Sequence, residues 1–512
     1  MEYKIWGLMT SPVSTAADWK TLFPEPVAVL GYGVEGRSTL NHLLRRGFTD
    51  ITVLDRAAPS EPLPAGVKGV FGAEYLNGLA PDSGVRTAFR APGVRPLVPQ
   101  IESFVARGGL LTSQVEATFA LLGRDRIVGV TGTVGKGTCC SLLSAMLDAA
   151  NISHRLAGNI GLPPLDALDD FIASDDADRA RALPSTALLL LELSSFQLST
   201  LRASPRLAVV LRTTIEHLDW HATRAEYWDH KANLVRFQKS GDVRVYCGDA
   251  DGSRWIGSLQ VVEANRECTG GDGVRRVCVS SANRTDDQMP GVARDDLIAL
   301  TPSEILWPAR ALRLALTETN MTGAFNLENI AAAAAAALTL GASAAAVREG
   351  ARRFSPLEHR IEFVREHEGV RYFNDSYATR PEATLAAVRA FKAQGTNGGA
   401  PALGLILGGS EKNVDFDDLA RALKDEPQLR AIAFIGHTAG RLEAALRAAG
   451  ALEGRAHRRI DAGDDTLAEA IGYLRSEIRG GVILMSPACA SFGLFANYKE
   501  RGKAFKKLVN AL

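Results

Sequence analysis

The stretch Arg126–Ala150, RIVGVTGTVGKGTCCSLLSAMLDAA, decides how the middle of this chain folds. It begins with a short run of apolar and β-branched residues, which is typical of a buried strand. A glycine-rich segment follows, and then a longer run whose apolar residues recur at helical spacing. A strand, a glycine loop and a helix in this order open a β-α-β unit, so we expect a largely parallel α/β sheet here.

The glycine-rich segment also has the residues of a phosphate-binding loop. Successive backbone amides and a helix N-terminus can surround phosphate oxygens, and one lysine adds a positive charge. A glycine-lysine turn also occurs in ordinary strand-to-helix connections, but its position between strand and helix favours phosphate binding. Gly137 stands where a serine or threonine hydroxyl usually helps to hold magnesium. The predicted loop residues are Gly132, Thr133, Gly135, Lys136, Gly137 and Thr138.

The segment Leu188–Leu198, LLLLELSSFQL, predicts a second buried strand with a single carboxylate, Glu192, at its end. Ligands of doubly wound sheets bind beyond the carboxyl ends of the strands. We therefore expect Glu192 to face the phosphate loop and to bind Mg²⁺, which prefers oxygen ligands. The alternative is that Glu192 is a helix cap or a turn residue.

A third apolar strand, RLAVVL at residues 206–211, leads into a segment with His217 and Lys231. A lone histidine is more often structural than a ligand. This histidine, however, follows a core strand at the same predicted sheet edge as Lys136 and Glu192. The three strand ends together predict a magnesium-ATP site.

Near the N-terminus, Gly31, Gly33 and Gly36 form a Gly-x-Gly-x-x-Gly pattern, and Asp55 follows about twenty residues later. This pattern fits a dinucleotide-binding β-α-β unit, and alone it predicts an NAD(P)-dependent oxidoreductase. The same turn can hold another diphosphate-linked nucleoside. The second loop around Lys136 favours ATP chemistry instead.

The alternation of strands and helices predicts three consecutive α/β domains, at residues 1–115, 116–354 and 355–512. The first and third are expected to be Rossmann-like, and the central one to resemble a P-loop ATPase. A polar, glycine-containing stretch at about residues 264–292 predicts loops and short strands of a peripheral insertion.

Composition limits the partners. Lysine plus arginine and aspartate plus glutamate number 58 each, so no net charge attracts nucleic acid or an anionic membrane. The six cysteines have no metal-binding spacing and are expected to be reduced thiols. The N-terminus lacks the pattern of a signal peptide, and no apolar run reaches membrane-spanning length. We therefore expect a cytoplasmic protein, a monomer without nucleic-acid or membrane partners.

The last third of the chain has polar residues at several predicted strand ends. The segments LEHR, NDSYAT, LGGSEK and SPACASF combine small residues with single charged or hydroxyl groups. Such loops suit a small molecule that carries carboxylates. Ordinary surface turns are the alternative, and the segments alone do not exclude it.

Taken in order, TGTVGKGT, AGNIGLP, LELSSFQL, HLD, NLEN, EHR, NDSYAT, LGGSEK and SPACASF resemble the Mur ligases of peptidoglycan synthesis. The resemblance covers nearly the whole chain, apart from the polar stretch at 264–292. It is strongest to the branch that joins glutamate to UDP-N-acetylmuramoyl-L-alanine. This branch implies ATP, two magnesium ions and an acyl phosphate intermediate, with UDP-N-acetylmuramoyl-L-alanine and glutamate as substrates.

The resemblance also implies roles for individual residues. Lys136, Lys231 and His217 would be catalytic, and Lys231 would be carbamylated by CO₂. The expected metal ligands are Thr138, Glu192, His217 and Lys231. ATP would be bound by Gly132, Thr133, Gly135, Lys136, Gly137, Thr138, Asn326, Asn329, Arg360 and Asp375. The UDP substrate would be bound by Gly31, Gly33, Val34, Gly36, Asp55 and Asn159, and glutamate by Thr379, Lys412, Ser491 and Phe492.

Two departures leave alternatives open. Tyr377 stands where relatives have a lysine that helps to bind the glutamate carboxylate, so ligation of L-glutamate instead of D-glutamate is one alternative. A second alternative is that the chain is another ATP-dependent amide ligase. Because Gly137 lacks the hydroxyl that usually helps to hold magnesium, a third alternative is a nucleotide-binding switch without catalysis.

Overall fold

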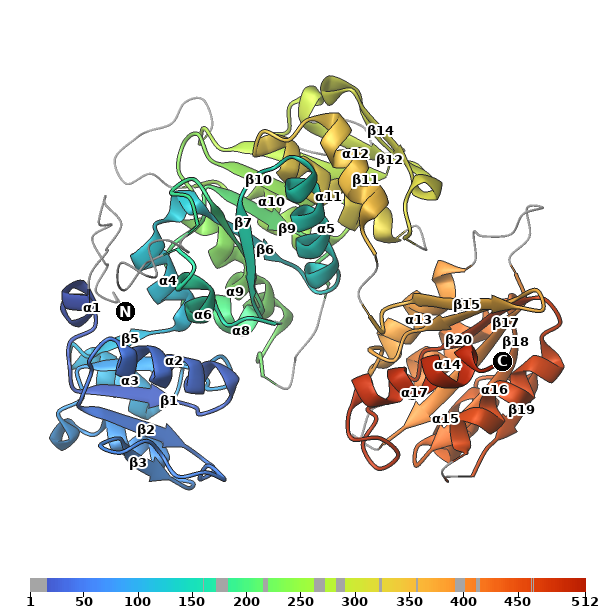
Figure 1. Ribbon diagram of the computed structural model, residues 1–512, viewed down its shortest axis with the longest axis horizontal. Helices are drawn as coiled ribbons and strands as arrows, with labels where there is room; N and C mark the ends of the chain where they lie inside the picture. Colours follow the sequence, from blue (N-terminus) through green and yellow to red (C-terminus); the bar gives the residue numbers. More distant parts are fainter. Residues whose placement is uncertain are drawn as a thin grey trace. The chain divides into compact units, whose positions relative to one another are not determined.

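The computed structural model of the chain describes residues 16–159, 161–171, 183–214, 220–261, 272–281, 291–321, 325–355, 358–391, 401–410, 415–461, 463 and 465–512. These residues form three sheets, of five, nine and six strands (Figure 1). They divide into two compact units. The first comprises Met1–Leu314 with Glu328–Phe354, and the second comprises Ala315–Leu327 with Ser355–Leu512. The predicted α/β class is confirmed, whereas the domain limits at residues 115 and 354 stay predictions.

The five-stranded sheet of the first unit has the order β3-β2-β1-β4-β5, and its neighbouring strands are parallel. The order reverses between β1 and β4, which is where doubly wound sheets bind their ligands. The strands are β1 Val27–Leu30, β2 Ile51–Asp55, β3 Lys68–Phe71, β4 Thr87–Arg90 and β5 Leu110–Thr112. The helices are α1 Ala16–Leu22, α2 Val34–Arg45, α3 Pro99–Ala106 and α4 Gln114–Leu122.

The nine-stranded sheet has the order β14-β13-β12-β11-β10-β9-β6-β8-β7. Its strand β6 lies between β8 and β9 and is parallel to both. The strands are β6 Ile127–Thr131, β7 His154–Gly158, β8 Leu188–Glu192, β9 Leu207–Val210, β10 Val243–Cys247, β11 Arg275–Ser281, β12 Leu297–Leu300, β13 Glu304–Trp307 and β14 Leu312–Ala315. The helices are α5 Lys136–Ala149, α6 Pro164–Leu168, α8 Ser195–Leu198, α9 Arg224–Arg236, α10 Asp251–Ser258, α11 Phe325–Thr339 and α12 Ala344–Arg353.

The prediction of a peripheral insertion at residues 264–292 was wrong for its central part. Strand β11 pairs in parallel with both β10 and β12, so it is an internal strand of the sheet. Buried Val277, Cys278 and Val279 place it in the core. The flanking polar and glycine residues concealed this strand, because its apolar run is short. The rest of the stretch, at 264–271 and 282–290, lies outside the described residues.

The second unit contains the six-stranded sheet, in the order β15-β16-β20-β17-β18-β19. Edge strand β15 is antiparallel to β16, and the other neighbouring strands of this sheet are parallel. The strands are β15 Glu362–His367, β16 Val370–Asn374, β17 Leu403–Gly409, β18 Leu429–Gly436, β19 Ala456–Arg459 and β20 Gly481–Met485. The helices are α13 Pro381–Ala390, α14 Asp417–Lys424, α15 Ala439–Ala448, α16 Thr466–Glu477 and α17 Tyr498–Asn510.

Fully buried aliphatic strands form the centre of each sheet, because parallel strands are covered on both faces. In β8, for example, Leu189, Leu190 and Leu191 are all fully buried. Among the helices in the described part of the chain, none is long and apolar enough to cross a membrane.

Candidate active site

The predicted phosphate loop connects β6 to α5. Gly135 directly precedes α5 and has a φ of +88°, in the left-handed region that favours glycine. A Cβ atom at this position would lie 2.1 Å from Oδ1 of Asn329. The backbone conformation therefore favours glycine here, and any side chain would displace the amide of Asn329.

Side chains hold this loop in place from several sides. Lys136 Nζ donates to the carbonyl oxygens of Gly132 and Thr133, at 3.0 Å each. The Thr133 hydroxyl lies 3.0 Å from the hydroxyl of Tyr227 and accepts a hydrogen bond of 3.0 Å from Thr214 N. In the first turn of α5, Gly137 is buried and Thr138 is half-buried.

Glu192 is the last residue of β8 and is only 4% exposed. It pairs in register with Val130 of β6, so its carboxylate lies beside the strand that enters the phosphate loop. Asn159 Nδ2 donates to Glu192 Oε1 at 3.3 Å. The helix cap that follows is Ser194, whose hydroxyl accepts from Gln197 N, so the alternative of Glu192 as a helix cap is wrong.

Lys231 comes to the same place from helix α9. Its side chain is buried, and Nζ donates to the Gly132 carbonyl oxygen at 2.8 Å and to Thr131 Oγ1 at 3.4 Å. The ring of Tyr227, one helical turn earlier, lies 4.8 Å from Nζ. The structure thus brings Lys136, Glu192 and Lys231 together at the end of β6. His217, predicted as their neighbour, lies outside the described residues.

Helix α11 supplies the two predicted asparagines, and both are buried. Asn329 packs against Gly135, and Asn326 lies in the first turn of the helix. Between them, Glu328 forms a salt bridge with Arg212, which follows β9. Burial acts to lower the pKa of Arg212, but the hydrogen bonds that its guanidinium donates to this carboxylate, with the nearby negative charge, raise the pKa above its usual value, so the guanidinium stays charged. This pair was not predicted, because a charged pair so far apart in sequence leaves no local pattern.

The glycine turn of the first sheet has the expected geometry. Gly31 has a φ of +86°, and a Cβ atom at Gly36 would lie 1.9 Å from the Gly31 carbonyl oxygen. Asp55 ends the neighbouring strand β2, and its Oδ2 accepts from Tyr32 N at 2.5 Å. Gly33 and Val34 are exposed at the start of α2, where backbone amides can meet a ligand.

Sequence reasoning missed a buried polar cluster that joins this first sheet to the segment after Glu192. Arg90, the last residue of β4, donates to the Phe196 carbonyl oxygen and to Ser199 Oγ, at 3.0 Å each. Gln197 Nε2 donates to Glu35 Oε1 at 2.7 Å. Burial raises the pKa of Glu35 to about 7. The only sequence signal was Gln197 within LELSSFQL.

In the second unit, Asp375 follows β16 and is buried. Burial raises its pKa to about 7, although hydrogen bonds from the Ser486 hydroxyl (2.7 Å) and Ile361 N (3.2 Å) act in the opposite direction. The Arg360 guanidinium lies 3.8 Å from the centre of the Tyr377 ring. Thr379, two residues after Tyr377, is half-buried.

Ser491 and Phe492 lie in the loop between β20 and α17. Ser491 is buried, whereas Phe492 is 56% exposed. A residue that sequence reasoning missed, Arg501 of α17, is buried and binds this loop to the turn after β16. It donates to the carbonyl oxygens of Ser376, Cys489 and Ala490 and to the Ser376 hydroxyl. Lys412, predicted for the same region, lies outside the described residues.

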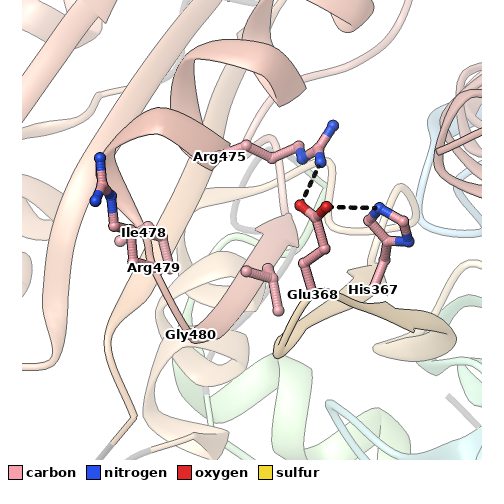
Figure 2. A pocket seen from close by; sticks show the side chains of 7 residues that line it. His367, Glu368, Arg475, Ile478, Arg479 and Gly480 are labelled. Atoms are coloured by element: carbon pink, nitrogen blue, oxygen red, sulfur yellow. Dashed lines mark hydrogen bonds and ion pairs between the residues drawn. The ribbon is translucent and has the colours of Figure 1, made fainter.

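A pocket of about 480 Å³ lies elsewhere on this unit (Figure 2). Glu368 forms an ion pair there with Arg475, at 3.0 Å, and its carboxylate lies 3.7 Å from Nε2 of His367. The lining residues Val370 and Gly480 lie at the amino ends of β16 and β20, opposite the edge that carries Asp375. Of the predicted site residues within the described ranges, none lines this pocket.

Comparisons with known proteins agree with this geometry. The family model of the Mur ligase middle domain matches residues 130–337, and that of the Mur ligase glutamate ligase domain matches residues 359–489. The UDP-N-acetylmuramoylalanine–D-glutamate ligase of Symbiobacterium thermophilum is 33% identical over 499 residues, which cover 95% of this chain and 98% of that protein. The protein of the same name from Acetivibrio thermocellus is 32% identical, and the match covers 96% of this chain and 98% of that protein.

Solved structures support the fold. The MurF ligase from Thermotoga maritima in complex with ADP matches with a TM-score of 0.54 and 17% identity, over 99% of this chain and 100% of that one. A pseudomurein peptide ligase type C from Methanothermus fervidus matches with a TM-score of 0.53 and 15% identity, over 95% of this chain and 99% of that one. The chain belongs to the Mur ligase family, whose members are ATP-dependent ligases. Within the family, the similar proteins of Symbiobacterium thermophilum and Acetivibrio thermocellus carry the name of the D-glutamate-adding ligases.

Proposed function

We propose that this enzyme ligates D-glutamate to UDP-N-acetylmuramoyl-L-alanine, with hydrolysis of ATP to ADP and phosphate, in the cytoplasmic synthesis of peptidoglycan precursors. The observation that carries the proposal is the meeting of Lys136, Glu192 and Lys231 at the end of β6. The names of the full-length relatives support the choice of substrates.

The proposed reaction has two steps. A carboxylate oxygen of the alanyl group attacks the γ-phosphorus of ATP, the bond to the ADP oxygen breaks, and an acyl phosphate forms. The glutamate amine then attacks the acyl carbon, loses a proton, and phosphate leaves as the amide forms. Two anions must meet in the first step, so positive charge near the transferred phosphoryl group lowers the barrier. Lys136 supplies such a charge at the phosphate loop.

The residues at this edge also fit a magnesium site. The buried Glu192 carboxylate and the Thr138 hydroxyl offer the oxygen donors that this cation prefers. We propose that two ions are held by Thr138, Glu192, His217 and a carbamate on Lys231. Magnesium bound there would neutralise phosphate and carboxylate oxygens. Addition of CO₂ to the Lys231 amine would replace a cation by an anion beside the Gly132 carbonyl. The uncarbamylated ammonium would instead repel a metal ion.

The substrates are assigned to the two units by their strand-end loops. Gly31, Gly33, Val34, Gly36, Asp55 and Asn159 are proposed to bind the UDP substrate. Glutamate would be bound by Thr379, Lys412, Ser491 and Phe492, and Arg360 and Asp375 would contact ATP. The resemblance implies a lysine where this chain has Tyr377, but Arg360 lies against the ring of Tyr377 and keeps a cation at this position. This contact favours retention of a carboxylate-binding site.

The test is phosphate release from ATP with UDP-N-acetylmuramoyl-L-alanine and each glutamate enantiomer in turn. We expect release with D-glutamate and formation of one amide per phosphate, measured by mass spectrometry. Faster turnover with L-glutamate would reject the proposed enantiomer but keep the ligase reaction. No release with either enantiomer, although ATP binds, would reject the reaction and favour a nucleotide-binding switch.

A further inference from the structure

Helix α9 and the turn before it carry a cluster of side chains that could bind a metal and that the proposed reaction does not use. One ligand atom each of His221, Glu226 and His230 lies within 4.8 Å of the others. Both histidines are buried and Glu226 is half-buried. Glu226 and His230 are four residues apart in the helix, so they lie on one face.

The surroundings fix the two imidazoles. His221 Nε2 lies 2.9 Å from Ser195 Oγ, and its ring stacks on Phe196 with an interplanar angle of 8°. The ring centres of His221 and His230 are 5.1 Å apart. Hydrogen bonds to the second nitrogen commonly orient imidazoles that bind metals. The packing around His221 and His230 thus places two imidazole nitrogens next to the carboxylate of Glu226.

His230 has a feature that packing alone does not explain. It is 9% exposed, and its Nδ1 atom has no hydrogen-bond partner among the residues that the structure describes. A buried polar atom without a partner is unfavourable, and buried polar atoms are usually satisfied by protein, water or an ion. The half-buried Glu226 leaves a path by which a cation could enter.

We propose that His221, Glu226 and His230 bind one Zn²⁺ ion, separate from the proposed magnesium site. Two imidazoles and one carboxylate are a common zinc ligand set, with a fourth position for water. Magnesium instead prefers oxygen ligands throughout. The ligand atoms of a tetrahedral zinc ion lie about 3.4 Å apart. Side-chain rotations that move the ligand atoms by about 1 Å would therefore bring the three groups to zinc-binding distance. The ion would fix the first turns of α9 and, through Ser195, the segment that follows Glu192.

The experiment uses the full-length, tag-free enzyme, stripped with EDTA and kept in excess Mg²⁺. Zn²⁺ affinity is measured by competition with a chromophoric chelator, and Co²⁺ absorption reports the coordination geometry. We expect one equivalent of bound Zn²⁺ and tetrahedral Co²⁺ bands. His230→Ala and Glu226→Gln should each weaken binding about 100-fold or more, since even the loss of an outer partner costs 10–100-fold.

Two variants serve as matched controls. Asp229→Asn removes a neighbouring carboxylate of the same helix, and Glu192→Gln alters the proposed magnesium site; both should bind Zn²⁺ as the wild type does. Circular dichroism checks the fold, and Glu226→Gln decides the question if His230→Ala unfolds. Less than one equivalent in the wild type, or normal binding by the folded ligand variants, would overturn the proposal. So would loss of binding in Glu192→Gln, because the ion would then lie in the magnesium site.

Discussion

The Nζ atom of Lys231 lies 2.8 Å from the carbonyl oxygen of Gly132, a residue 99 positions earlier in the chain. Helix α9 thus places a buried amine at the first residue of the phosphate loop, beside Glu192 at the end of the adjacent strand. A charged ammonium and a carbamate would have opposite effects on metal binding at this position. The identity of this group therefore determines how the site works.

Lys231→Ala should lower the rate of ligation by about 100-fold or more, because a group that stabilises transition-state charge is lost. Nucleotide binding should persist, since Lys136 and the loop remain. A short carboxylic acid added to the buffer should restore part of the phosphate release by occupying the place of the carbamate. The exposed Lys239→Ala is the control and should keep full activity. Absence of any rescue would argue against the carbamate.

Glu192→Gln removes one negative charge but keeps the shape of the side chain and its contact with Asn159. We expect the Mg²⁺ concentration needed for half-maximal phosphate release to rise at least about tenfold, because an oxygen ligand loses its charge. The thermal unfolding midpoint should change little. Asp148→Asn on the exposed face of α5 is the control. An unchanged Mg²⁺ requirement would remove Glu192 from the metal site.

Gly36→Ala should lower the free energy of unfolding by about 1–3 kcal/mol, because the new methyl group would collide with the Gly31 carbonyl oxygen. Gly33→Ala in the same turn is the matched control. Nothing lies within 4 Å of a Cβ at Gly33, so stability should stay within about 0.5 kcal/mol of the wild type. Urea unfolding of both variants measures the difference. Equal stability of the two variants would contradict the close approach seen at Gly36.

Glu35 should make stability depend on pH. Its pKa is raised by burial from 4.5 to about 7, so the folded state holds a proton that the unfolded state releases between these values. Its contribution is fully present below pH 4.5 and is lost as pH rises to about 7, by up to roughly 3 kcal/mol. In urea unfolding at pH 5 and pH 8, Glu35→Gln should lose less stability on going to pH 8 than the wild type does. The exposed Glu74→Gln should follow the wild type.

Arg501→Met should lower the free energy of unfolding by about 3 kcal/mol or more, because buried carbonyl oxygens lose their donor. The loop that carries Ser491 would lose its link to the turn after β16. We therefore also expect KM for glutamate to rise more than KM for ATP. Lys503→Met, two residues away and exposed on the same helix, is the control. Equal rises of both KM values would limit Arg501 to a structural role.

Much of the fold could be read from the sequence, because its signals are local. The alternation of apolar strands, glycine turns and helices predicted the α/β class, and the runs that end at Asp55 and Glu192 have those ends in the structure. Strand β11 was missed, since its short apolar run lies between polar segments. The roles of the predicted site residues stay predictions, and His217 and Lys412 lie outside the described residues.

By itself, the sequence indicated which residues were candidates for binding phosphate or metal and where strands such as β2 and β8 end, because those properties depend on residue types a few positions apart. Only the tertiary structure decided which of these residues meet. Strand β8 lies directly beside β6, and α9 folds back to bring Lys231 to Gly132. The contacts of Arg90, Gln197, Arg501 and His230 likewise depend on the packing of distant segments, since sheet order and helix packing are set by the burial of apolar faces across the whole chain.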